Sequence, residues 1–154
     1  MTDRTFFTDD EWAALTHAPL HVTVAVVAVS EHGPVSLLKE ASATAKALAR
    51  PGDHGTATEL VTAIAHEAQG HDARHAARGD RGSSPQEVID EALAELAPAT
   101  AAIDRLPIAE AAEVRAWLID LAHAVAGAAK GTSDKEAAVI ERIRVALGAP
   151  PAGS

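Results

Sequence analysis

The fold is decided by the stretch from Ile108 to Lys130, IAEAAEVRAWLIDLAHAVAGAAK. Apolar side chains recur in it every three or four residues, at Val114, Leu118 and Leu121, and this is the spacing of one face of an α-helix. Alanine fills so many of the other positions that such a helix is apolar around most of its circumference, which is typical of a buried helix. The sequence therefore predicts an all-α protein with a central apolar helix near 108–130.

Helix starts outside this stretch carry a common signal. The pattern Ser/Thr-x-x-Glu, which is the signature of a capping box, precedes an apolar stripe at Thr8, Thr56, Ser84 and Ser133. At the first of these, Phe7 and Trp12 have the spacing of a hydrophobic staple, which fixes how the chain enters the helix. Four separate start signals in one short chain favour the all-α fold.

Working outward from these starts gives a bundle of about six to seven helices. The first runs from Asp9 to His17, and Pro19 restarts the chain as a second segment to about Ser30. The others are a third from near Pro34 to Pro51, a fourth after Thr56, a fifth after Ser84 with a kink at Pro98, a sixth over 108–130, and a seventh after Ser133 that Gly148 closes.

The stretch from His21 to Val29 is rich in β-branched residues and also has the length of a buried strand. A single strand needs a partner. Because the chain contains no second run rich in valine and isoleucine, we predict that this stretch is helical.

The chain has 154 residues, which is enough for one compact domain. We expect a single helical domain over 1–148, with a flexible Gly-rich loop at about 76–83 and a disordered tail over 149–154. Alanine occupies 37 positions and aromatic residues make up 3% of the chain, so each buried side chain contributes little apolar area. The absence of cysteine excludes disulfides, thiolate metal sites and thiol nucleophiles.

The formal net charge of −9 argues against partners that carry phosphate backbones or anionic lipid. The 13 basic residues are scattered along the chain. The first residues lack the basic start and the following apolar stretch that are typical of a signal peptide. The longest apolar run, Val22 to Val29, is too short to span a bilayer. We therefore expect an acidic, cytoplasmic protein that binds neither nucleic acid nor membranes.

Three histidines gather between residues 66 and 75. A zinc-protease helix places its two histidines four residues apart, whereas His66 and His71 are five apart and point about 140° away from each other. Glu67, His71 and His75 do share one helix face and could hold a divalent metal with a fourth ligand from elsewhere. The competing interpretation is that these side chains are the solvated polar end of an exposed helix.

A second candidate pair, Asp120 and His123, lies one turn apart on the predicted central helix. Polar groups inside an apolar helix need hydrogen-bond partners, so the pair is interpreted first as a tie to a neighbouring helix and second as part of a metal or catalytic site. Trp117 on the same helix is either a core residue or an anchor for a partner or ligand.

The segment from Ala128 to Glu136, followed by Ile140, Ile143 and the Leu147-Gly148 pair, resembles the closing helix pair of TerB-like tellurite-resistance proteins. The resemblance implies an all-helical fold and a stress-associated or signalling accessory role. In that family an acidic residue precedes the turn glycine and contributes to a metal-binding cluster. Lys130 stands at that place here, so the family's metal site is not implied. The chain as a whole also resembles small alanine-rich bacterial proteins.

The nucleophile elbow, the Walker loop and the dinucleotide-binding Gly pattern are all missing from the sequence. The first hypothesis is therefore a non-enzymatic helical domain that acts by protein association, as a homo-oligomer, without a cofactor. The alternatives are a divalent-metal-binding protein and a bundle that binds a small apolar ligand in a cavity near Trp117.

Overall fold

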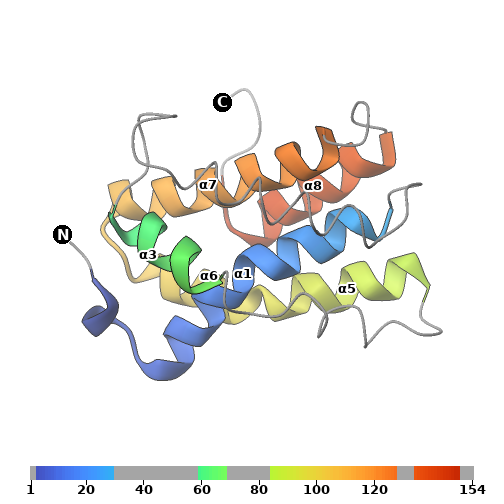
Figure 1. Ribbon diagram of the computed structural model, residues 1–154. Helices are drawn as coiled ribbons and strands as arrows, with labels where there is room; N and C mark the ends of the chain where they lie inside the picture. The colour runs from blue at the N-terminus through green and yellow to red at the C-terminus, as the bar shows by residue number, and fades with distance from the viewer. Residues whose placement is uncertain (1–2, 30–58, 69–83, 128–133, 150–154) are drawn as a thin grey trace.

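The computed structural model describes residues 3–29, 59–68, 84–127 and 134–149 (Figure 1). These ranges contain a short 3-10 helix and six α-helices, and no strand. The elements are η1 (Arg4–Phe6), α1 (Asp9–Val27), α3 (Glu59–Ala68), α5 (Pro85–Glu95), α6 (Ala97–Asp104), α7 (Ile108–Gly127) and α8 (Asp134–Ala146). The all-α prediction is confirmed.

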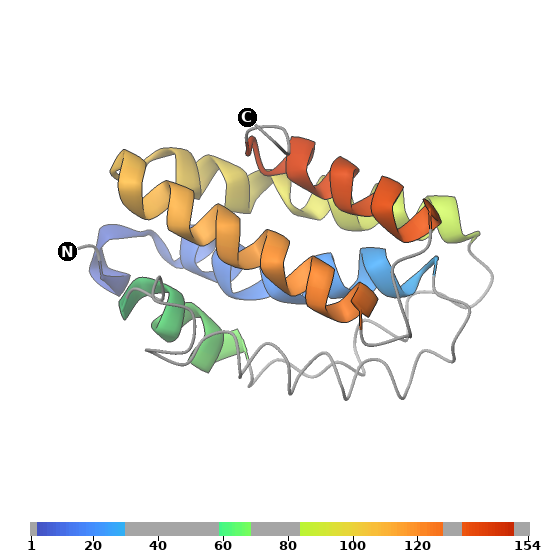
Figure 2. The ribbon, with the colours of Figure 1, turned by 90° about the horizontal axis from the view of Figure 1, so that it is seen from above.

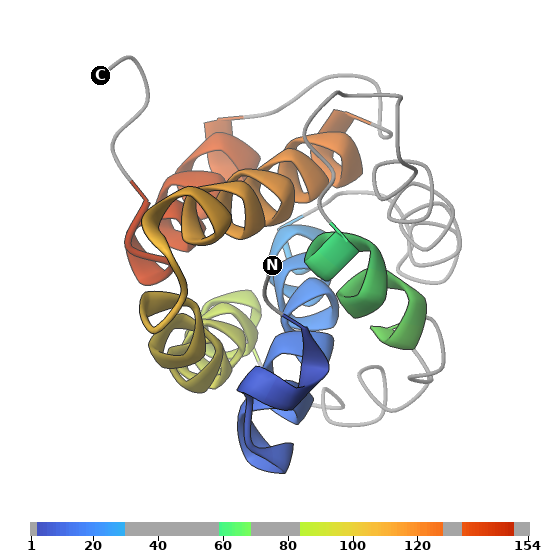
Figure 3. The same ribbon diagram turned by 90° about the vertical axis from the view of Figure 1, so that its left-hand side faces the viewer.

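Helix α1 runs through the middle of the bundle. It packs against α3, α5, α6, α7 and α8, which are arranged around it in Figure 3. The predicted central helix, α7, packs against α1, α3, α6 and α8, and its Leu118 and Leu121 are fully buried. The core therefore forms where α1 and α7 meet, with Val22 and Ala25 as the most deeply buried residues of α1.

The prediction that Pro19 separates two helical segments is wrong. Helix α1 continues through Pro19 to Val27, and Pro19 is buried in its interior. A proline in a helix interior removes one backbone hydrogen bond and crowds the carbonyl four residues earlier. The Thr23 hydroxyl donates to the Pro19 carbonyl at 2.8 Å. Burial of apolar residues on both sides of the proline outweighs the missing bond, and it places the valine-rich stretch in a helix, as predicted.

The first capping box is present with both of its hydrogen bonds. The Thr8 hydroxyl accepts from the Glu11 N–H at 3.2 Å, and the Glu11 carboxylate accepts from the Thr8 N–H at 2.8 Å. The rings of Phe7 and Trp12 lie 5.9 Å apart, centroid to centroid, so the predicted staple also forms. These contacts fix the start of α1 at the predicted residue.

Ser84 is the second of the four predicted helix caps that lies within the described residues. Its hydroxyl accepts from the Glu87 N–H at 3.3 Å. The kinked helix predicted after it is two helices, α5 and α6, that meet at Leu96. Pro98 lies in the first turn of α6, where the N–H that a proline lacks would have no partner within the helix. The interruption predicted at this proline is therefore present, as a break between two helices at Leu96, whose backbone keeps helical angles (φ −75°, ψ −18°).

Gly148 ends α8, as predicted. It adopts φ +69°, donates to the Val145 carbonyl at 3.0 Å, and is followed by an Ala149 N–H that donates to the Arg144 carbonyl at 3.0 Å. This pair of bonds is a Schellman motif, which requires a left-handed residue and so favours glycine.

Several predictions fall outside the described residues. They are the caps at Thr56 and Ser133, the helix from 34 to 51, the loop at 76–83, and the tail from 150 onward. Helix α7 is described as far as Gly127 of its predicted span to Lys130. Among the described helices, none is long and apolar enough to cross a membrane.

Candidate binding face on helices α5 and α8

Hydrogen bonds from two neighbouring helices hold the carboxyl end of α8 in place. The Thr100 hydroxyl of α6 donates to the Ala146 carbonyl at 2.9 Å, and the Arg115 Nε of α7 donates to the Leu147 carbonyl at 2.7 Å. Arg115 also forms an ion pair with Asp104. These bonds satisfy carbonyls that a helix end leaves without partners, and they make α8 a fixed part of the bundle surface.

The two faces of α8 differ sharply. Its inner face is formed by Val139, Ile140 and Ile143, which are all buried. Its outer edge carries Val145, a large apolar residue that is 72% exposed. An apolar side chain presented in this way on a fixed helix is a candidate contact for a partner.

An open groove runs between α8 and α5, which lie together along one side of the bundle (Figure 2). Across it, Arg142 of α8 donates to the Asp90 carboxylate of α5 at 2.6 Å. Its walls are mostly apolar, with charged residues at the rim. The lining residues are Leu93, Ala138, Glu141, Arg142, Val145 and Ala146.

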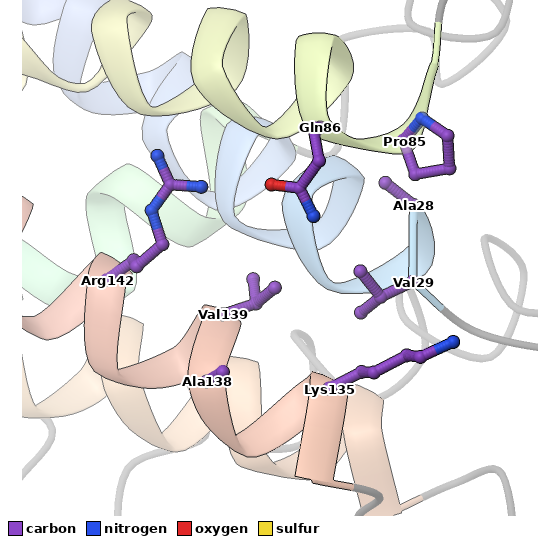
Figure 4. Close-up of a pocket in the computed structure, with 8 residues that line it drawn as sticks. All are labelled: Ala28, Val29, Pro85, Gln86, Lys135, Ala138, Val139 and Arg142. Carbon is purple, nitrogen blue, oxygen red and sulfur yellow. The ribbon is translucent and has the colours of Figure 1, made fainter.

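The groove continues into a deeper cavity where α1 ends and α5 and α8 begin (Figure 4). Ala138 and Arg142 line both the groove and the cavity. The cavity has a volume of about 560 Å³, within the range of pockets that hold small molecules. The two hollows together form one binding face along α8.

Helix α3 carries Glu67, the first residue of the predicted metal set. Its carboxylate accepts a hydrogen bond from the Trp12 indole N–H at 2.5 Å, so it joins α3 to α1. His71 and His75 lie outside the described residues. Within the described ranges, no group of three or more metal-ligating side chains occurs.

Asp120 and His123 are both exposed, which contradicts their predicted place in the interior. They continue a strip on the outer side of α7 that begins with the exposed Ala112 and Ala116. Alanine is apolar but is also common on helix surfaces. The exposed alanines of this strip therefore made α7 look apolar on all sides in the sequence. Neither side chain has a hydrogen bond or ion pair with another described residue, so the predicted tie is not seen in this part of the chain.

Trp117 points into the bundle and is only 6% exposed, so it is not presented to a surface partner. Its indole N–H, and the Glu113 Oε2 one turn earlier, have no hydrogen-bond partner within the described residues. Neither the groove nor the cavity is lined by Trp117. The predicted ligand cavity beside this indole therefore has no counterpart in these two hollows.

The chain matches no protein-family model, no curated protein and no solved structure. The resemblance to TerB-like proteins therefore stays a prediction, and the binding face is interpreted from its own residues.

This face was not predicted from the sequence, because the apolar stripe of the last helix, Ile140, Ile143 and Leu147, lies on its inner side. Ala138 and Val145 lie off that stripe and are two turns apart. Two apolar residues at that spacing on the polar side of an amphipathic helix are the signal that could have revealed it.

Proposed function

We propose that this protein is a non-enzymatic helical domain that acts by protein association, and that the partner is a second copy of the same chain. The observation that carries the proposal is the exposed Val145 beside Leu93 on the α5–α8 groove. Exposed apolar surface rimmed by charge is characteristic of association sites.

The order of residues along α8 makes this face complementary to itself. In a symmetric dimer the same patch meets its own copy across a two-fold axis. If that axis crosses two antiparallel α8 helices between Glu141 and Arg142, each Glu141 faces the Arg142 of the other copy. The same axis sets the small Ala138 opposite the larger Val145. The Val145 side chain of each copy then packs on the Ala138 methyl group of the other copy.

The energies of these contacts favour the apolar pair as the main source of affinity. Fully burying a valine side chain contributes about 1.5–3 kcal/mol, and each copy provides one. An exposed ion pair contributes about 0–1 kcal/mol, so the Glu141–Arg142 pairs mainly set the orientation. Stable dimers bury roughly 1,200–2,000 Å², and the adjoining surface of α5 around Leu93 would supply the rest.

Sedimentation equilibrium over a series of protein concentrations tests the proposal. The unmodified chain is expected to dimerise, and Val145→Asp to shift it to monomer because a charge would be buried at the contact. Ile108→Asp is the matched control, since Ile108 is 90% exposed but lies at the start of α7 and outside the groove. A chain that stays monomeric at high concentration, or a Val145→Asp variant that dimerises normally, would overturn the proposal.

Charge reversal tests the orientation of the two copies. Glu141→Arg is expected to weaken dimerisation because it places like charges opposite each other. Adding Arg142→Glu in the same chain restores opposite charges and is expected to recover most of the affinity. A double variant weaker than Glu141→Arg alone would contradict the antiparallel arrangement, and unfolding midpoints would show whether losing the bond to Asp90 has altered the fold.

A further inference from the structure

The cavity at the end of the bundle combines an apolar floor with cationic and amide groups, and the proposed dimer does not account for this combination. It lies where Ala28 and Val29, directly after the end of α1, meet the first turn of α5 and one side of α8. The residues that line it are Ala28, Val29, Pro85, Gln86, Lys135, Ala138, Val139 and Arg142 (Figure 4).

The floor of the cavity is aliphatic. Val29 and Val139 point toward each other across it, and Ala28 lies beside Val29 (Figure 4). Val139 is 4% exposed, so this floor belongs to the core of the bundle. Such a surface binds hydrocarbon groups, because burying them removes apolar area from water.

The polar side chains around this floor are those that bind anions. The Gln86 amide reaches down from α5, and Lys135 extends along the edge of the cavity from α8 (Figure 4). Neither side chain has a hydrogen bond or ion pair with another described residue. Arg142 gives one nitrogen to Asp90 at 2.6 Å and, with five N–H donors on its guanidinium group, has others to offer.

The surrounding backbone also favours negative charge. The amino-terminal ends of α5 and α8 both lie at this cavity, and a helix start carries a partial positive charge. Acidic residues do occur in these first turns, at Glu87, Asp134 and the buried Glu136, but none of these three lines the cavity. The charged side chains among the residues that line the cavity are both cations, Lys135 and Arg142, and Arg142 is paired with Asp90.

We infer that this cavity binds a small amphipathic carboxylate, with the hydrocarbon group on Val29 and Val139 and the carboxylate between Lys135 and Gln86. A small inorganic anion could contact only the polar side chains and would bury no apolar area on the floor, so it is expected to bind more weakly than the amphipathic carboxylate. The lysine excludes cationic amphiphiles of the same length by charge repulsion.

Calorimetric titration with decanoate, below the concentration at which it forms micelles, tests the inference. Decanoate is expected to bind, and decylamine, which has the same chain and the opposite charge, is not. Lys135→Gln should weaken decanoate about fivefold, as expected for the loss of a partly exposed ion pair. Val29→Asp should abolish binding, because it places a carboxylate in the floor.

Arg105→Gln is the matched control for charge. It removes one positive charge at the opposite end of α1, where Arg105 pairs with Glu11, and it should leave decanoate affinity unchanged. No binding of decanoate by the unmodified chain, equal binding of decylamine, or equal affinities of the Lys135→Gln and unmodified chains would each overturn the inference. Since Lys135 is exposed, its substitution is expected to preserve the fold, which far-UV circular dichroism would check.

Discussion

Trp12 donates its indole N–H to the Glu67 carboxylate at 2.5 Å, across 55 residues of sequence. The ring is 5% exposed, it contacts Phe7, and the Arg4 guanidinium lies 5.4 Å from its centroid. One polar bond thus fastens α3 to the capped start of α1, at the end of the molecule opposite the cavity.

Replacing Glu67 should therefore loosen α3. Glu67→Ala leaves the partly buried indole N–H without its acceptor, and we expect the free energy of unfolding to fall by about 1–2 kcal/mol. Glu67→Gln retains an acceptor oxygen and should be closer to the original stability. Urea titrations followed by circular dichroism measure both, and equal stabilities of all three proteins would show that the bond contributes nothing.

The capping box at Thr8 should have its own effect on stability. Thr8→Ala removes the hydroxyl that accepts from Glu11, and we expect a loss of about 1 kcal/mol. Thr8→Ser keeps the hydroxyl and serves as the control, with stability close to that of the unmodified chain. Thermal unfolding monitored at the helical circular dichroism band distinguishes the two, and an unchanged Thr8→Ala variant would contradict the assigned cap.

His21 should make stability depend on pH. Burial is the main cause and lowers the pKa of His21. The Glu95 carboxylate, 3.8 Å from the His21 Nε2, raises this pKa in part, and His17 lowers it further. The folded chain therefore resists protonation of His21. As the pH falls below the ordinary pKa of histidine, about 6.5, the unfolded chain binds more protons than the folded chain. Stability should therefore be complete above that pH and decrease below it.

His21→Gln tests this dependence. Urea unfolding at about pH 7.5 and about pH 5.5 should show a smaller difference for this variant than for the unmodified chain. His123→Gln is the control, because His123 is exposed, and it should keep the original difference. Equal differences in all three proteins would contradict the role assigned to His21.

Asp120 and His123 should tolerate substitution. Both are exposed on the outer side of α7, and surface changes of this kind shift stability by less than about 0.5 kcal/mol. Asp120→Ser and His123→Ser are therefore expected to unfold at nearly the same urea concentration as the original chain. A loss of 2 kcal/mol or more, about the size expected for a broken buried polar pair, would mean that the predicted tie to a neighbouring helix exists.

The helices could be predicted because the signals that start and stop them are local. The cap at Thr8 and the stop at Gly148 depend on residues within one turn, and both lie where the sequence places them. The continuation of α1 through Pro19 could not be predicted, because it depends on burial against other helices and no local pattern reports that burial.

The candidate sites were harder to predict for the same reason. Glu67 was assigned by its spacing to histidines on its own helix, whereas its described partner, Trp12, is distant in sequence. Val145 is a candidate contact because α5 lies beside it, with Leu93 in the same groove. Neither contact follows from periodicity along one helix.

Disulfide trapping of two single-cysteine variants tests the antiparallel dimer most directly, and the chain has no cysteine of its own to interfere. Ala138→Cys and Val145→Cys proteins, mixed and oxidised, should form a covalent heterodimer, because the proposed axis sets these positions opposite each other. Each variant alone should stay uncrosslinked, since its two copies would lie roughly 10 Å apart along the helices. Crosslinking of either variant with itself, or none in the mixture, would contradict the account.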